Sequence, residues 1–180
     1  MKKKLLAILL SLTFVFAFTA CGDSSESTSD TAGSDEAATE ETTVEETVYG
    51  VGDTWTVDGQ WNFTIDSVEA TDQRNEFEES NPEQVIYIKY HYENLGYEDE
   101  DGIMDGLYIS PEQVIDSDGN VCTEYPINPE DIYPQETPVG AKCTAGIAFG
   151  LAKAGSPVTM NLSVYDGHGT EQTAKFNLEF

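Results

Sequence analysis

The clearest structural pattern in the chain lies in residues 84–94, which run Gln84-Val85-Ile86-Tyr87-Ile88-Lys89-Tyr90-His91-Tyr92-Glu93-Asn94. Large apolar side chains occupy every second position from Ile86 to Tyr92, and the positions between them hold Tyr87, Lys89, His91 and Glu93. Successive side chains of a β-strand point to opposite faces, so this period of two separates an apolar face from a polar one. The segment predicts a strand in the middle of a sheet that has one buried face and one face in water.

The same alternation extends to both sides of this segment. Residues 51–57 and 61–68 flank Asp58-Gly59, a strong signal for a two-residue hairpin turn. Residues 112–115 and 121–125 flank a second turn signal at residues 116–120. These spacings predict two antiparallel hairpins.

Three more strands are predicted at residues 142–151, 158–165 and 174–180. No segment shows a convincing helical period, and the strands are short and separated by turn residues. This pattern predicts an all-β antiparallel sandwich over residues 48–180, with a small barrel as the alternative.

The N-terminus predicts export. Residues 1–20 combine a short cationic start with an apolar run over residues 5–18, which is shorter than the roughly 20 residues that span a bilayer. Phe18-Thr19-Ala20-Cys21-Gly22 resembles the lipobox of bacterial lipoproteins, with Phe18 where an aliphatic residue is usual. The resemblance implies a diacylglyceryl and palmitate anchor on Cys21, on the extracytoplasmic side of the membrane. The alternative is an ordinary secretory cleavage nearby, with Cys21 left as a spare thiol.

Residues 21–47 predict a disordered acidic tether between this anchor and the sandwich. They consist almost entirely of Ser, Thr, Asp, Glu, Ala and Gly, and they offer nothing apolar enough to repay the entropy of ordering.

Charge limits the partners. The chain has 34 acidic and 8 basic residues, a net charge of −26, and three of the basic residues belong to the signal segment. Such a chain does not attract nucleic acid or anionic lipid headgroups. The membrane contact is therefore expected through the Cys21 lipid, and the partner is expected to be a protein or another component of the cell envelope.

The remaining cysteines are Cys122 and Cys143. Outside the cytoplasm such a pair usually closes, so a disulfide between them is predicted, with two small buried thiols as the alternative.

Several of the predicted strands carry a family resemblance. The motifs are Val51-Gly52-Asp53-Thr54-Trp55-Thr56-Val57, Phe63-Thr64-Ile65-Asp66-Ser67-Val68, Ile88-Lys89-Tyr90-His91-Tyr92-Glu93-Asn94-Leu95-Gly96, residues 116–120, Pro138-Val139-Gly140 and Ala148-Phe149. In this order they resemble the immunoglobulin-like domain-of-unknown-function 4352 family of Gram-positive bacterial lipoproteins. The resemblance implies an immunoglobulin-like sandwich and no catalytic residues.

Nothing in the sequence indicates an enzyme. His91 and His168 are the only histidines, and neither lies in a motif that would pair it with a nucleophile. Both are interpreted as surface or turn residues. An envelope hydrolase remains the least favoured function.

A calcium-dependent surface-binding domain is a stronger alternative function than an envelope hydrolase. Carboxylates cluster in residues 98–105, where Glu98, Asp99, Asp101 and Asp105 are weak candidates for calcium ligands. The default interpretation of this cluster is a solvated run of charge, so no metal or other cofactor is expected.

The sequence therefore predicts a lipid-anchored binding or accessory domain without catalytic activity. Strand alternation places most aromatic residues in the core, and Tyr87, Tyr97 and His91 are the candidates for exposed binding residues. The long loops at residues 70–83 and 126–140 are the expected binding surface, because function in β-sandwiches usually lies on loops.

Overall fold

The structure is a computed structural model that describes residues 47–180. The predicted signal segment, Cys21 and the tether up to residue 46 lie outside the described residues. The described chain forms strands and no helix: β1 (Val48–Tyr49), β2 (Thr54–Val57), β3 (Trp61–Thr71), β4 (Gln84–Asn94), β5 (Gln113–Ile115), β6 (Val121–Glu124), β7 (Lys142–Leu151), β8 (Val158–Tyr165) and β9 (Glu171–Leu178). No membrane-spanning helix therefore occurs within residues 47–180.

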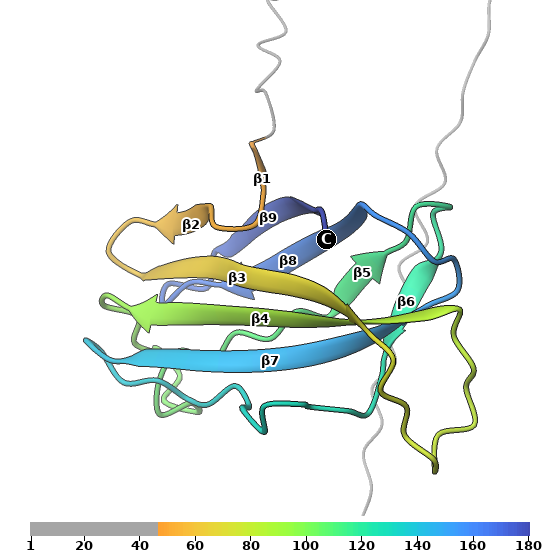
Figure 1. The fold of residues 1–180 in the computed structure, drawn as a ribbon. Helices are drawn as coiled ribbons and strands as arrows, with labels where there is room; N and C mark the ends of the chain where they lie inside the picture. The colour runs from red at the N-terminus through yellow and green to blue at the C-terminus, as the bar shows by residue number, and fades with distance from the viewer. Residues whose placement is uncertain (1–46) are drawn as a thin grey trace, which may run out of the picture. The chain divides into compact units, whose positions relative to one another are not determined.

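The strands form two packed layers (Figure 1). One layer, the β8 sheet, contains β1, β9, β8 and β5, and the other, the β4 sheet, contains β7, β4, β3 and β2. Every pairing is antiparallel except the parallel pair of β1 with β9. Strand β6 joins the layers, because Val121 and Cys122 pair with β5 whereas Thr123 and Glu124 pair with β7. The predicted β-sandwich is confirmed, and the predicted central strand is β4, between β3 and β7.

The core lies between the two sheets. Ile86, Ile88, Tyr90 and Tyr92 of β4 are fully buried there, as the alternation predicted. The Phe63 ring lies 5.4 Å from Tyr90 in its own sheet and 5.6 Å from Phe176 in the β8 sheet, so aromatic contacts connect the layers.

The outer face of β4 is not uniformly wet. Lys89, His91 and Glu93 are half-buried as expected of a partly exposed face, but Tyr87 is only 6% exposed. Its ring joins a small second cluster with Val85, Tyr125 and Ala148, and its hydroxyl donates to Asn128 Oδ1 at 3.0 Å. Burial raises the pKa of the Tyr87 phenol to about 12. The prediction that Tyr87 is exposed is therefore wrong.

Two distant parts of the chain cause this burial. Residues 126–140 run beside β7, where Ile132 O accepts from Gly146 N at 3.1 Å, and thus cover the outer face next to Tyr87. A glycine in β7 makes room for the ring, because a Cβ on Gly146 would overlap the Tyr87 side chain. Residues 126–140, which the sequence predicts to be a binding loop, thus also cover part of the outer face of the β4 sheet.

The predicted disulfide is not formed: Cys122 and Cys143 are both free and buried. Thr123 pairs with Gly150, which places Cys122 near Leu151, at the far end of β7 from Cys143. Positions 143 and 151 are about 26 Å apart along an extended strand, whereas the Cα atoms of a disulfide lie within about 7 Å. Burial raises the pKa of the Cys122 thiol to about 11. The alternative of two buried thiols describes the structure.

This arrangement predicts that both thiols react in denaturant without prior reduction. In a Cys21→Ser chain we expect the thiol reagent to titrate Cys122 and Cys143 in full, and we expect the melting temperature to be unaffected by reductant. A chain that yields these thiols only after reduction would contradict the register of β6 and β7.

The fit between Gly146 and Tyr87 predicts a strong coupling. Gly146→Ala should lower the free energy of unfolding by about 1–3 kcal/mol, the usual cost of overpacking, and the loss should be much smaller in a Tyr87→Leu background. Denaturant unfolding of the two single variants and the double variant measures the coupling. Thr144→Ala, at an exposed position of the same strand, is the control. Equal losses in both backgrounds would show that the ring does not use the space at Gly146.

Candidate functional site

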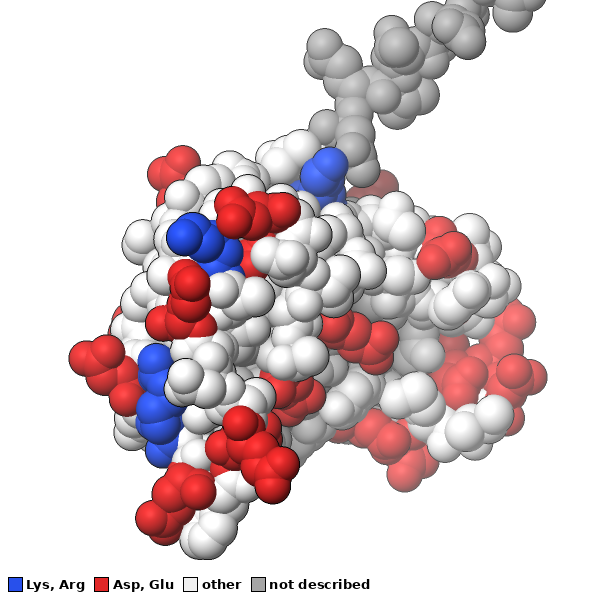
Figure 2. Space-filling view, turned by 90° about the vertical axis from the view of Figure 1, so that its right-hand side faces the viewer, with Lys and Arg blue, Asp and Glu red and all other residues white. Residues whose placement is uncertain are grey.

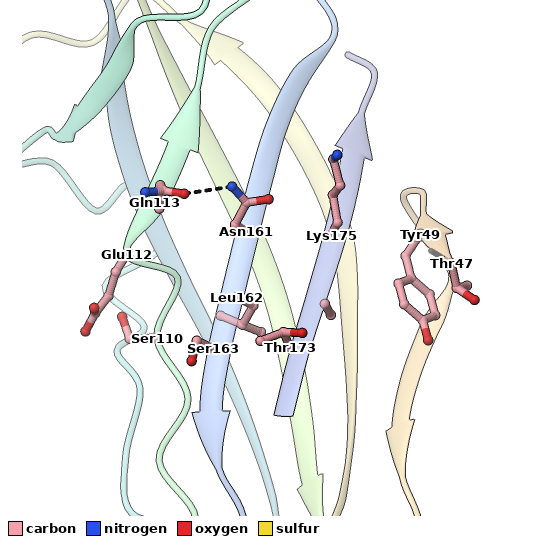
Figure 3. Close-up of a pocket in the computed structure, with 11 residues that line it drawn as sticks. Thr47, Tyr49, Ser110, Glu112, Gln113, Asn161, Leu162, Ser163, Thr173 and Lys175 are labelled. Carbon is pink, nitrogen blue, oxygen red and sulfur yellow. Dashed lines mark hydrogen bonds between the residues drawn. The ribbon is translucent and has the colours of Figure 1, made fainter. Parts of the chain in front are cut away.

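A shallow groove of about 580 Å³ crosses the outer face of the β8 sheet (Figure 3). Its floor is a row of three outward side chains, Gln113 of β5, Asn161 of β8 and Lys175 of β9. Strand pairing sets this row, because Gln113 lies opposite Asn161 and Asn161 lies opposite Lys175. Asn161 Nδ2 donates a hydrogen bond of 2.7 Å to Gln113 Oε1 across β5 and β8.

Two segments border the groove. Ser110 and Glu112, just before β5, form one side, and Thr47 and Tyr49, at the start of the described chain, form the other. The Tyr49 ring is packed 5.3 Å from Phe176, so β1 is attached to the core as well as hydrogen-bonded to β9. The border formed by β1 is therefore held by both packing and pairing.

The groove differs in charge from the rest of the protein. Its charged lining residues are Glu112 and Lys175, of opposite sign, and the remaining polar ones carry amides or hydroxyls. Strand β8 contains no charged residue. Elsewhere carboxylates predominate, and the face in Figure 2 shows many more acidic than basic side chains. The groove is thus a nearly neutral hydrogen-bonding surface on a chain of net charge −26.

A second, smaller groove of about 420 Å³ lies beside β7 and is aromatic. Tyr108 and Tyr133 line it and are 42% and 56% exposed. Pro126 and Pro134 also line it. The sequence prediction missed these two tyrosines. For Tyr108 a signal was present, because Leu107 and Ile109 alternate with it and are buried, which leaves Tyr108 on the outer face.

The predicted binding residues do not form a site. Tyr97 is 9% exposed and packs its ring 6.1 Å from Trp61, so the prediction that it is exposed is wrong. The Asn94 side chain holds this turn, because its Oδ1 accepts from Tyr97 N at 2.7 Å. His91 is half-exposed on the outer face of β4, where its Nδ1 lies 2.7 Å from Asp66 Oδ1. Tyr87 and Tyr97 thus belong to two different buried clusters, and His91 lies apart in a contact with Asp66.

In the acidic loop 98–105, the Asp99 carboxylate stabilises a turn. Asp99 accepts hydrogen bonds from the backbone N–H groups of Asp101, Ile103 and Met104, at 2.9–3.2 Å. These bonds, with that of Met104 contributing most, lower the pKa of Asp99. Asp105 donates its N–H to Glu136 Oε2, and Glu100 faces His168. Within residues 47–180 no three His, Cys, Asp or Glu side chains gather as metal ligands would, and calcium binding by Glu98, Asp99, Asp101 and Asp105 stays a prediction.

His168 links two turns. It lies in the turn between β8 and β9, and its Nδ1 is 3.0 Å from Glu100 Oε1. The hydrogen bond with Glu100, followed by the charge of that carboxylate, raises the pKa of His168.

Comparison with known proteins identifies similar folds. No known family profile matches the chain, and no curated protein matches it. The yjhA protein of Bacillus subtilis has a similar structure, with a TM-score of 0.55 and 15% identity over 73% of this chain and 100% of that one. The secreted protein MPT63 of Mycobacterium tuberculosis is also similar, with a TM-score of 0.50 and 14% identity over 76% of this chain and 99% of that one. These similarities support the β-sandwich, and the family resemblance of the strand motifs stays a prediction.

The contact between His168 and Glu100 predicts a pH-dependent stabilisation. A histidine whose pKa is raised by folding stabilises the folded state below its ordinary pKa of about 6.5, and this contribution disappears as the pH rises through the raised value. The melting temperature of the protein should therefore exceed that of Glu100→Gln most at about pH 5–6, and the gap should close in alkali. A His168→Gln background should abolish the gap at every pH, and a pH-independent gap would contradict the ion pair.

Proposed function

We propose that this chain is a membrane-anchored, extracytoplasmic lipoprotein whose β-sandwich is a non-catalytic binding or accessory module. The observation that carries the proposal is the neutral groove across β5, β8 and β9. Amides and hydroxyls line it on hydrogen-bonded strands, so a ligand meets groups that are already ordered and loses little entropy in fixing them.

The sequence supports the location. Cys21 follows small residues and an apolar run, and this pattern resembles the lipobox, so a lipid on Cys21 is the proposed anchor. Residues 21–47 join that anchor to the sandwich, and Thr47 lies at the border of the groove. An acidic domain is repelled by anionic headgroups, which favours contact with other components of the envelope.

The proposal predicts the cellular location of the protein and its binding to the cell envelope. In cells, Cys21→Ser should move the protein from the membrane fraction to the medium, whereas Ser24→Ala should leave it on the membrane. The released Cys21→Ser chain should sediment with isolated cell-envelope fragments, and adding Gln113→Ala and Asn161→Ala should remove most of this sedimentation. Asn177→Ala, on the same strand as Lys175 and outside the groove, is the matched control.

Two outcomes would contradict the proposal. A Cys21→Ser protein that stays in the membrane fraction would show that the anchor is not at Cys21. Envelope binding that is absent, or that the groove variants do not change, would show that the groove is not the binding site.

A further inference from the structure

We propose that the groove on the β8 sheet binds a neutral glycan whose sugars carry N-acetyl groups. This inference rests on the proposed function, since it names the ligand class of the same groove.

The charge of the groove favours an uncharged ligand. Opposite charges on Glu112 and Lys175 leave the lining close to neutral, although the chain as a whole carries −26. A phosphate-rich or carboxylate-rich polymer would approach against the field of the whole protein, and it would find one lysine and a glutamate in the groove. A cationic ligand would be drawn to the many carboxylates outside it. An uncharged ligand is the one whose affinity would be highest at this neutral surface.

The amide pair on the groove floor offers a ligand one donor and one acceptor. Gln113 and Asn161 share one hydrogen bond, and this leaves the other amide atom of each side chain, Gln113 Nε2 and Asn161 Oδ1, for a ligand. If both amides are turned over, the pair still leaves one donor and one acceptor. An N-acetyl group presents the complement of this pair, an N–H donor and a carbonyl acceptor on one short planar unit. A hydroxyl also donates and accepts, but it does both through a single oxygen atom.

Hydroxyl groups extend this pattern along the groove. In Figure 3, Ser110, Ser163 and Thr173 lie below the amide pair, further along the groove and on three different segments. Ser163 donates to Glu171 Oε1 at 2.6 Å and so keeps its oxygen lone pairs as acceptors for sugar hydroxyls. A volume of about 580 Å³ is within the usual range for a site that holds a small ligand, and it is suited to a short oligosaccharide.

The test uses tetra-N-acetylchitotetraose as the probe, with cellotetraose as a control that has the same backbone and no acetyl groups. We expect calorimetry on the full chain in detergent to show saturable binding of the acetylated sugar and at least tenfold weaker binding of cellotetraose, about the loss of two hydrogen bonds. Gln113→Ala and Asn161→Ala should each weaken binding about fivefold, as expected for one net hydrogen bond. Asn177→Ala should keep the parental affinity, and melting curves will show that the variants fold.

The inference is overturned if the acetylated sugar does not bind, if cellotetraose binds equally well, or if both amide variants keep full affinity. It is also overturned if binding is lost on Tyr108→Ala and Tyr133→Ala, because the ligand would then lie in the aromatic groove. Envelope sedimentation separates this failure from that of the proposed function. If sedimentation still depends on Asn161, only the glycan assignment falls, and if it does not, both proposals fall.

Discussion

Strand β4 is the constraint on which the structure depends, because it is hydrogen-bonded on both sides and buried on one face. Its pairing with β3 and β7 is continuous apart from one irregularity between Ile65 and Ser67. A shift of one residue would turn Ile86, Ile88, Tyr90 and Tyr92 out of the core and bring Lys89 and His91 into it, so burial of this face strongly favours the observed register over that shift. The aromatic contacts of Phe63 with Tyr90 and Phe176 then hold the two sheets together around this strand.

Alternation within single segments was enough to predict most of the fold. Strands β4, β7 and β8 have the predicted bounds, and the turns at Asp58-Gly59 and residues 116–120 join the predicted hairpins. The errors arose where a distant segment changes the environment of a residue. Tyr87 is buried because Gly146 makes room for its ring and residues 126–140 cover it. The sequence around Tyr87 indicates neither of these contacts. The predicted disulfide failed for the same reason, since only the register of β6 with β7 shows how far apart the two cysteines are.

The candidate site shows this limit most clearly. Gln113, Asn161 and Lys175 come from three strands that are far apart in the sequence, and each alone is an ordinary outward residue on a strand. Only their pairing places them in one row and joins two of them in a hydrogen bond. The composition of β8 did indicate part of the candidate site, because this strand has no charged residue in a chain with 34 acidic ones. On the outer face of this uncharged strand, an uncharged ligand would cover fewer charged side chains than elsewhere on so acidic a protein.

We propose that ligands bind on the β8 sheet and not in the aromatic groove beside β7. The most direct measurement is an amide-resolved NMR titration of the protein with soluble glycan fragments released from cell envelope. We expect shifts concentrated at Gln113, Asn161, Ser163 and Lys175, including the side-chain amides of the first two. Shifts centred on Tyr108 and Tyr133, or none at saturating fragment, would contradict it.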